Sequence, residues 1–409
     1  MKALYWIRND LRLLDNLAIE WLCKNGSEVL LIYFLPNDFK KWGVERRNFH
    51  RETLENFKEN LSRFGLSLNI SLKKPAELIP QLISEHQVEA LLFTKDFAFN
   101  EALEEKLVLD QLNGVKILGF DQMTMLHQED LPFAIQDLPN LFTDFKNKVE
   151  NKIPIRPPVE TQELNFKSIN LPHEMIDWGS VKSTPNFHGG ETFGLQRVQD
   201  YLWNTDSIKT YFETRNGMIS FNDSSKFSPW LANGSISARF VFQEIQKYEE
   251  TREKSKSTYW IFYELLWRDY FKFYAKKFGA KIFMPNGISK KEHTFENSQE
   301  NFLAWKEGRT AEPFINANMN ELAKTGWMSN RGRQNVANYL AKTMKVNWIW
   351  GAEWFETMLI DYDPCSNWGN WNYNAGVGTD QRDRIFHPPN QALRYDPENF
   401  YQNKWLIKE

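Results

Sequence analysis

The hydrophobic periodicity of this chain changes near its middle, and the change limits the folds that the chain can adopt. In the first 120 residues, short apolar runs rich in β-branched residues alternate with amphipathic stretches. This alternation is typical of a parallel sheet with crossover helices. After Glu191 the periodicity is almost purely helical. We therefore predict an α/β protein, in which a long linker joins an N-terminal doubly wound parallel α/β domain to an all-α domain.

The apolar runs and amphipathic stretches of the first part predict its strands and helices. The expected strands are Lys2–Ile7, 28–35, 67–72, 89–94 and 115–120, and the expected helices are 16–25, 46–64, 76–86 and 100–112. In the second part we expect helices over 237–248, 258–278, 319–322, 331–343 and 352–361. No GxGxxG motif follows the first strand, so a conventional dinucleotide site is not expected in the α/β domain.

Prolines and two adjacent glycines interrupt both patterns between about residues 127 and 190. A connection of this length without any structure is unusual, so part of it, such as 142–150, is expected to pack as a short helix. The predicted division is an α/β domain over 1–126, a linker over 127–190 and an all-α domain over 191–409.

The composition excludes several classes of protein. No apolar run approaches the roughly 18 to 20 residues that span a bilayer, and the first residues are charged too early for a secretory signal. We expect a cytoplasmic protein without contact to membranes. The two cysteines and seven histidines show no metal-ligand spacing, so we expect no structural metal.

Charge and aromatic residues are unevenly distributed. Residues 251–350 contain 17 Lys/Arg against 9 Asp/Glu, although the whole chain has a net charge of −3. A locally basic face can neutralise phosphates, although the same charges also fit a solvated surface. Twelve of the 16 tryptophans follow residue 200. They either fill a helical core or serve a planar ligand or electron hopping.

Three segments of the helical part have unusual compositions. In the first, Ser224, Ser225, Lys226, Phe227 and Ser228 precede a helix start, where hydroxyl and N–H groups can hold phosphate oxygens. The alternative is a simple helix cap. The second, residues 325–335, contains Arg331 and Arg333 with three amides, and buried arginines need anionic or carbonyl partners. The alternative for this segment is an exposed basic helix start. The third, residues 361–376, interleaves Asn, Gly and aromatic residues without a helical period, which indicates a binding loop or a structural loop.

These segments, together with 6–12 and 263–270, resemble motifs of the photolyase/cryptochrome family, and the resemblance spans essentially the whole chain. The sequences SSKFSPWLA, SNRGRQN and NWGNWNY resemble those of the DASH branch of that family. The resemblance implies blue-light-driven repair of cyclobutane pyrimidine dimers in DNA, by electron transfer from photoexcited reduced FAD.

In this family FAD binds to the helical domain in a folded, U-shaped form. The resemblance places its phosphates at residues 224–228 beside Tyr211, and its ring between Arg333 and Asp361. A guanidinium there stabilises negative charge on the reduced ring. Asn367 matches the position that faces flavin N5, which favours a fully reduced flavin. The remaining matched positions around the flavin are Asn330, Tyr362 and Asp363.

Three tryptophans match the electron-hopping chain of the family. The resemblance places Trp371 nearest the flavin, Trp348 next and Trp305 towards the surface. The chain would reduce oxidised flavin under light and would take no part in the repair cycle itself. Taken singly, each of these indoles also fits an ordinary core position.

Glu264 matches the carboxylate that contacts the pyrimidine dimer and stabilises its radical anion. The alternative for Glu264 is a surface salt bridge with Arg268 four residues later. Trp267, Arg268, Gln334 and Tyr373 would line the lesion cavity. Gln334 and Tyr373 replace the Met and Trp that duplex-repairing relatives usually have. The weaker apolar grip fits a preference for single-stranded DNA, where flipping costs less.

The resemblance also implies a light-harvesting antenna in the α/β domain. Asn100, Glu101 and Glu150 match antenna contacts, and methenyltetrahydrofolate is preferred over a deazaflavin; Asn100 and Glu101 also fit an ordinary helix cap. We expect a monomer without the long C-terminal tail of signalling members. Three other functions stay open: a blue-light sensor without repair, a duplex-active photolyase, and a DNA-binding module in which flavin only adds stability.

Overall fold

The first strand is apolar on both faces, which is typical of a strand inside a parallel sheet. In β1 (Lys2–Ile7), Tyr5 packs into the core on one face of the sheet and Trp6 into the core on the other. β1 lies between β2 (Glu28–Phe34) and β4 (Ala90–Thr94), and the main sheet has the order β3-β2-β1-β4-β5 with every pairing parallel. The computed structural model describes residues 1–36, 38–160, 163–180, 186–290, 292–380 and 384–406.

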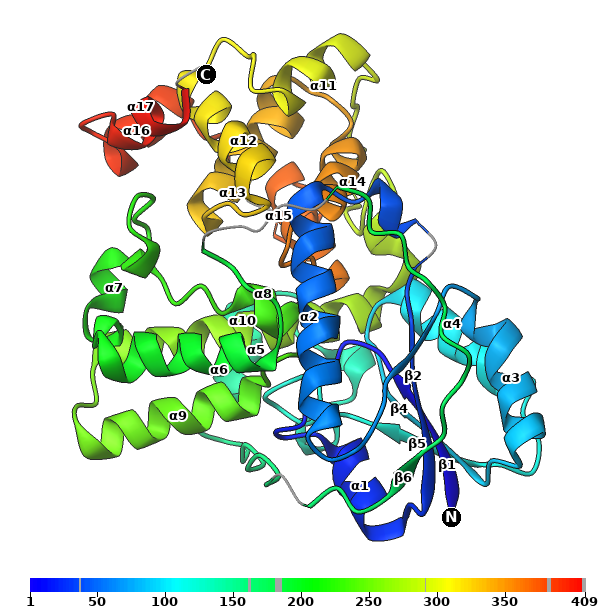
Figure 1. Ribbon diagram of the computed structural model, residues 1–409. Helices are drawn as coiled ribbons and strands as arrows, with labels where there is room; N and C mark the ends of the chain where they lie inside the picture. The colour runs from blue at the N-terminus through cyan, green and yellow to red at the C-terminus, as the bar shows by residue number, and fades with distance from the viewer. Residues whose placement is uncertain (37, 161–162, 181–185, 291, 381–383, 407–409) are drawn as a thin grey trace.

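Helices cover both faces of this sheet, as the doubly wound prediction requires (Figure 1). One core joins the sheet to α1 and α2, and the other joins it to α3 and α4. The remaining elements of this part are β3 (Asn69–Ser71), β5 (Lys116–Phe120), α1 (Leu17–Asn25), α2 (Val44–Ser62), α3 (Pro75–His86) and α4 (Phe99–Leu109). The predicted strands and helices are therefore confirmed in kind, with ends that differ by up to three residues.

The described residues of the predicted linker form two short 3-10 helices, Gln128–Asp130 and Ile135–Asp137, one α-helix and one strand. The expected short helix is α5 (Phe142–Val149). A two-residue strand, β6 (Lys167–Ser168), was not predicted, and it pairs with the first residues of β2. Residues 161–162 and 181–185 of this segment lie outside the described ranges. The domain boundaries themselves remain a prediction.

The rest of the chain is helical, as predicted (Figure 1). Its helices are α6 (Glu191–Gln199), α7 (Tyr211–Thr214), α8 (Ser228–Ala232), α9 (Ala238–Thr251), α10 (Lys256–Phe278), α11 (Gln299–Lys306), α12 (Pro313–Thr325), α13 (Asn330–Asn338), α14 (Trp348–Met358), α15 (Pro364–Ala375), α16 (Pro388–Tyr395) and α17 (Phe400–Leu406). A π-helical turn, Tyr339–Thr343, extends α13. None of the helices in the described ranges combines the length and the apolar content that crossing a membrane requires.

The prediction of an irregular loop over residues 361–376 is wrong, because most of that segment forms α15. The side chain of Asp363 accepts a hydrogen bond from the backbone N–H of Ser366 and so caps the N-terminus. Pro364 occupies the first helical position, where its missing N–H costs nothing. Gly376 ends the helix in the left-handed conformation, with a φ of 79°.

The asparagines of α15 explain why its sequence does not read as a helix. Asparagine side chains normally compete with the helix for backbone hydrogen bonds. In α15 their amides instead donate to carbonyls one turn earlier, from Asn370 to Ser366 and from Asn374 to Asn370, both at 2.8 Å. The segment therefore forms a helix although its sequence lacks the hydrophobic periodicity of one.

Buried polar contacts fix the sheet against the helical part. Asp15 accepts hydrogen bonds from the guanidinium of Arg239 at 2.5 and 3.1 Å, and both side chains are almost fully buried. Arg12 donates to the carbonyl of Gly234 at 3.0 Å. Gly234 has a φ of +71°, and an added Cβ would lie 1.9 Å from the carbonyl oxygen of Asn9. The two halves therefore meet too closely at Gly234 for any larger residue.

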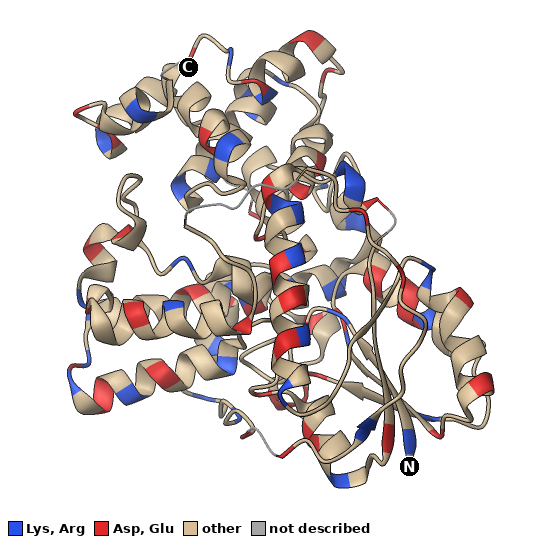
Figure 2. Ribbon diagram, viewed as in Figure 1, with Lys and Arg blue, Asp and Glu red and all other residues tan. Residues whose placement is uncertain are grey.

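The long helix α2 crosses the middle of the molecule and carries charges of both signs (Figure 2). On its exposed side, Arg51 pairs with Glu55 and Arg63 pairs with Glu59, each at helical i,i+4 spacing. Its apolar side packs on the sheet through Leu54, Phe57 and Leu61. These surface pairs contribute little stability, so the apolar side holds α2 in place.

Candidate cofactor and substrate site

A cavity of about 480 Å³ opens in the helical part of the chain. Side chains of α7, α8, α10, α13 and α15 line it, together with the segments that precede α8 and α15. Its volume lies within the range of small-molecule and cofactor sites. All three unusual segments of the sequence contribute to its wall.

Arg333 and Asp361 form an ion pair on the wall of the cavity. The guanidinium of Arg333 donates to both carboxylate oxygens of Asp361, at 2.8 and 2.9 Å, and to the carbonyl of Met328 at 2.9 Å. Ser228 donates to the same carboxylate at 2.6 Å. Ser329 caps α13 through the N–H of Gly332, and this cap fixes the helix turn from which Arg333 projects. The pair presents a planar cation to the cavity.

The segment before α8 holds a buried lysine. Lys226 is 6% exposed and has a φ of +57°. Its ammonium donates to the hydroxyl of Ser224 at 2.9 Å and lies 4.1 Å from the ring centre of Trp327. Burial lowers the pKa of Lys226 from 10.5 to about 8. Arg197 holds the backbone in this shape by donating to the carbonyls of Ser224 and Ser225. A buried ammonium that bonds a hydroxyl is suited to an anion such as a phosphate.

Asp363 is already paired within the protein. Its carboxylate accepts a hydrogen bond from the ammonium of Lys272 at 2.6 Å, and both side chains are buried. Burial alone would raise the pKa of Asp363, but Lys272 and Arg268 together lower it to about 2. Asn367 follows one turn later and donates to the carbonyl of Ala352 at 3.1 Å. Asp363 therefore orients α15, and Asn367 faces the cavity from it.

Several buried polar atoms of residues that line the cavity have no hydrogen-bond partner among the described residues. They are Trp371 Nε1, Asn374 Oδ1, Trp327 Nε1, Arg215 Nε and Arg331 Nε. Buried polar groups are nearly always satisfied in native proteins, so the cavity is built to receive a polar ligand. Donors outnumber acceptors in this set, and together with Lys226 they fit a ligand that carries phosphates and ring carbonyls.

Glu264 lies on the wall of the same cavity, and its salt bridge is not the one suggested by helical spacing. Its carboxylate accepts a hydrogen bond from Arg215 at 2.9 Å. Burial raises the pKa of Glu264, and Arg215 opposes that shift. Arg268 instead donates to the carbonyls of Met123 and Leu231, at 2.6 and 3.1 Å. The alternative of a Glu264–Arg268 salt bridge is therefore wrong, and Arg268 braces the wall from within.

The other residues expected near the cofactor or the lesion also line the cavity. Trp267 stacks on Phe142 of α5, with ring centres 3.7 Å apart. Gln334 accepts a hydrogen bond from Arg331 at 2.7 Å. The predicted residues that also line the cavity are Tyr211, Ser225, Phe227, Asn330, Tyr362 and Tyr373.

The tryptophans are arranged differently from the predicted chain. Trp371 lines the cavity, as expected. Trp305 does not lie towards the surface: it is 0% exposed and contacts Trp371 directly, with ring centres 6.1 Å apart. Trp305 is buried because it lies on the inner face of α11, where its Nε1 donates to the carbonyl of Val336. Trp348 is also buried and contacts Trp368 at 5.7 Å.

The predicted antenna residues lie on two separate helices. Asn100 is exposed in the first turn of α4, but the cap residue there is Ala98, so the capping alternative is wrong for Asn100. Burial raises the pKa of Glu101 to about 7. Glu150 ends α5 and accepts a hydrogen bond from the hydroxyl of Tyr259 at 2.7 Å. Within the described ranges, no hydrogen bond or ion pair joins Glu150 to Asn100 or Glu101.

Sequence reasoning missed Arg215 and Asn216, which line the cavity, and Lys272 and Arg197, which support lining residues from behind. Arg215 and Asn216 occupy an unremarkable turn, and only their position next to Gly217 indicates a loop. Lys272 lies on α10 two turns after Glu264, so it could have been placed on the same side of that helix. No sequence pattern points to Arg197, because it donates to the backbone carbonyls of Ser224 and Ser225, and a backbone carbonyl is present at every residue.

Comparison with known proteins agrees with this architecture. The family described as "DNA photolyase" matches residues 3–163, and the family described as "FAD binding domain of DNA photolyase" matches residues 260–408. The first match includes the parallel sheet, and the second includes much of the cavity wall. The protein is therefore of the class that has a photolyase-type FAD-binding domain.

Individual relatives match this chain over almost its whole length. The chain is 43% identical to "Cryptochrome DASH" of Synechocystis sp., over 99% of this chain and 87% of the relative. It is 41% identical to "Cryptochrome DASH, chloroplastic/mitochondrial" of Arabidopsis thaliana, over 99% and 75%. The crystal structure of the Synechocystis cryptochrome superimposes with a TM-score of 0.95 at 41% identity, over 99% of this chain and 88% of that chain. The chain therefore belongs to the photolyase/cryptochrome family, and its helical part contains the FAD-binding domain of that family.

Proposed function

We propose that this protein repairs cyclobutane pyrimidine dimers under blue light, as a deoxyribodipyrimidine photo-lyase that prefers single-stranded DNA. One observation carries the proposal: a single cavity has the Arg333–Asp361 pair and Asn367 on its wall together with Glu264. A cofactor ring held by the first group and a base held by Glu264 would therefore share one enclosed space. Electron transfer from the cofactor to the base requires that the two lie close together, and a shared cavity allows this.

In this proposal the cofactor end of the cavity includes residues 224–228. The ammonium of Lys226 and the hydroxyls of Ser224, Ser225 and Ser228 bind the FAD phosphates beside Tyr211. Arg333 stabilises negative charge on the reduced ring, because its guanidinium is fixed by Asp361 before any ligand binds. Asn367 supplies an amide near N5 that donates or accepts as required. Bound, reduced FAD supplies the photoexcited electron that splits the dimer.

The lesion end of the cavity contains Glu264, Trp267, Gln334 and Tyr373. Glu264 is the group that hydrogen-bonds the dimer and stabilises its radical anion, because Arg215 aims its carboxylate and burial raises its pKa. Trp267 and Tyr373 offer ring surface for the flipped bases. Gln334 is polar and already bonded to Arg331, which weakens the apolar grip and favours DNA that is already unpaired.

Further parts of the proposal concern the surroundings of the reaction. We infer that methenyltetrahydrofolate acts as an antenna near Asn100, Glu101 and Glu150, and that the protein acts as a monomer in the cytoplasm. The Arabidopsis relative is named chloroplastic/mitochondrial, so the location of this chain is best tested by fractionation of its own cells. The near-ultraviolet absorption of the purified protein tests the antenna, and a spectrum of flavin alone contradicts a bound folate.

Repair assays on matched oligonucleotides test the proposal. Single-stranded and duplex DNA with one thymine dimer is incubated with the FAD-loaded, reduced protein, in blue light and in darkness. We expect repair in light only, and faster on the single strand. The double variant Gln334→Met, Tyr373→Trp should improve repair of the duplex relative to the single strand. Bound FAD without repair on either substrate would favour a blue-light sensor, and equal repair of both would favour a duplex-active photolyase.

A further inference from the structure

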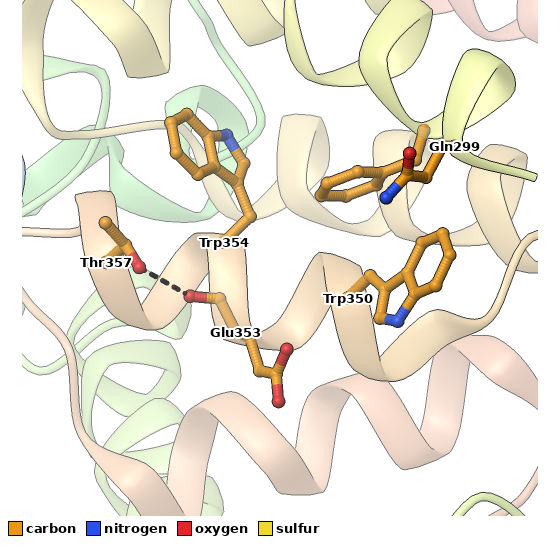
Figure 3. Close-up of a pocket in the computed structure, with 6 residues that line it drawn as sticks. Gln299, Trp350, Glu353, Trp354 and Thr357 are labelled. Atoms are coloured by element: carbon orange, nitrogen blue, oxygen red, sulfur yellow. Dashed lines mark hydrogen bonds between the residues drawn. The ribbon is translucent and has the colours of Figure 1, made fainter. Parts of the chain in front are cut away.

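A second pocket lies on the surface between α11 and α14, separate from the cofactor cavity. Its volume is about 330 Å³, which is near the lower end of the range for small-molecule sites. Figure 3 shows its wall, with Trp350, Glu353, Trp354 and Thr357 projecting from α14 and Gln299 from α11. Phe302 of α11 completes the lining, and none of these six residues lines the cofactor cavity. The pocket is therefore a candidate site for a second, smaller ligand.

The aromatic rings of this surface pocket meet at a steep angle. The rings of Phe302 and Trp350 lie 5.5 Å apart with an interplanar angle of 68°, so they form a corner. Trp354 follows Trp350 by about one turn of α14, and within the described ranges its ring contacts neither of the other two. A flat ligand stacks best against parallel ring faces. A corner of ring faces instead suits a compact group such as a methylated ammonium.

One acid and one base flank these rings, and neither has an ionic partner in the part of the chain that the structure describes. The carboxylate of Glu353 lies on the pocket wall, and Thr357 donates to the backbone carbonyl of Glu353 instead, at 2.9 Å. Burial raises the pKa of Glu353, so water only partly solvates this carboxylate. The ammonium of Lys306 lies 3.9 Å from the ring centre of Trp354. Because the two charged groups do not pair with each other, a ligand with two charges can meet both.

We propose that this pocket binds a small zwitterion that joins a methylated ammonium to a carboxylate, as glycine betaine does. The methylated ammonium rests in the corner of Phe302 and Trp350, where the ring faces and the carboxylate of Glu353 favour a positive charge. The carboxylate of the ligand meets the ammonium of Lys306 beside Trp354. Lys306 repels a simple cation, and Glu353 repels a simple anion. This inference does not depend on the proposed function.

The methyl groups matter because of what the corner offers. An unmethylated ammonium needs hydrogen-bond acceptors for its N–H groups, and the rings of Phe302 and Trp350 do not replace them well. A trimethylammonium has no N–H group to satisfy, and its methyl groups pack directly against the ring faces. The pocket should therefore distinguish glycine betaine from glycine, although both ligands carry the same two charges.

Calorimetric titration of the FAD-loaded protein in darkness compares three ligands. We expect saturable binding of glycine betaine. Glycine, which lacks the methyl groups, and choline, which lacks the carboxylate, should each bind at least tenfold more weakly. Lack of binding by glycine betaine, or equal binding by glycine or choline, would overturn the proposal.

Variants separate the contributions of the rings and the charges. Trp350→Leu and Glu353→Gln should each weaken the binding of glycine betaine at least tenfold. Lys306→Met should weaken glycine betaine but strengthen choline, because it removes the cation that attracts one and repels the other. Trp21→Leu, at a partly exposed indole of α1, is the matched control and should bind like the wild type. Wild-type affinity in Glu353→Gln, an exposed position where the fold is not at risk, would contradict the assignment.

Fluorine NMR locates the bound ligand. Protein labelled with 5-fluorotryptophan is titrated with glycine betaine, and the resonances missing from Trp350→Phe and Trp354→Phe identify these two indoles. We expect both resonances to shift with saturation, and shifts confined to other indoles would place the ligand elsewhere and contradict the proposal. Dimer repair should be unchanged in Glu353→Gln, so failure of this inference and failure of the proposed function can be told apart.

Discussion

The carboxylate of Glu264 accepts a hydrogen bond of 2.9 Å from Arg215, whose guanidinium lies 4.0 Å from the ring centre of Trp260. Arg215 follows the short helix α7 and Glu264 belongs to α10, so two elements distant in sequence hold one acid on the cavity wall. A carboxylate that only formed a surface pair within α10 would have no such fixed direction. The contact therefore makes Glu264 the acid best placed to meet a ligand.

We predict that Glu264→Ala lowers dimer repair and leaves bound FAD unchanged. A charge-assisted hydrogen bond is worth about 1.5–3 kcal/mol, which corresponds to a loss of about tenfold to a hundredfold in repair rate. Repair of a single-stranded thymine dimer and the flavin absorbance of the purified variant measure the two effects. Glu300→Ala, an exposed acid on α11, should match the wild type. An unchanged rate in Glu264→Ala would remove the role assigned to it.

Arg333→Lys should reduce FAD binding although the charge is kept. Arginine makes three hydrogen bonds here, two to Asp361 and one to Met328, and a lysine ammonium lacks the planar fork that satisfies them together. We expect at least a tenfold weaker affinity, or about 1.4 kcal/mol, in a titration of the apoprotein with FAD. Arg309→Lys, at an exposed surface pair, is the matched control. Equal affinity in both variants would contradict the assignment.

FAD affinity should fall at alkaline pH because of Lys226. Burial lowers the pKa of this ammonium to about 8, and a bound phosphate favours its charged form and so raises that pKa. Above pH 8 the apoprotein must therefore take up a proton when it binds FAD. Affinity should be constant below pH 8 and fall by up to about tenfold per pH unit above it. Lys226→Met should bind more weakly, with no such slope, and a slope retained in this variant would point to another group.

The buried pair of Lys272 and Asp363 should matter for stability. Lys272→Met leaves the carboxylate of Asp363 buried without its cation, which costs about 3–5 kcal/mol. Because Lys272 and Arg268 keep the pKa of Asp363 at about 2 in the wild type, its stabilising contribution persists above pH 4 and is lost as pH falls towards 2. In the variant that pKa rises, so the deficit should shrink on acidification. Chemical denaturation at pH 7 and pH 4.5 measures this, and Lys24→Met, at an exposed pair, should cost under about 1 kcal/mol.

The sheet could be predicted from the sequence because its strands are buried on both faces. β1, β2 and β4 consist almost entirely of buried residues, so their apolar runs mark them without knowledge of their neighbours. The ends of helices were less accurate, since caps such as Ala98 and Gly43 bond only through the backbone. β6 was not predicted because a strand of two residues is too short to show an alternation of apolar and polar residues.

The sequence predicted many of the residues that line the cavity, but not how they are arranged. The resemblance placed Arg333 beside Asp361, and the structure brings them to 2.8 Å. The helix α15 was missed because its asparagines satisfy carbonyls within their own helix, which hydrophobic periodicity does not reveal. The burial of Trp305 was missed because exposure depends on tertiary packing against Trp371 and Phe355. Such contacts join residues far apart in the chain, and no local pattern encodes them.

The central claim is that FAD and a flipped dimer lie together in one cavity. The fluorescence lifetime of the bound, reduced FAD tests it most directly, because electron transfer to a dimer shortens that lifetime. We predict a clear shortening with a single-stranded oligonucleotide that carries one thymine dimer, and none with the undamaged oligonucleotide. An unchanged lifetime at a saturating concentration of damaged DNA would contradict the account.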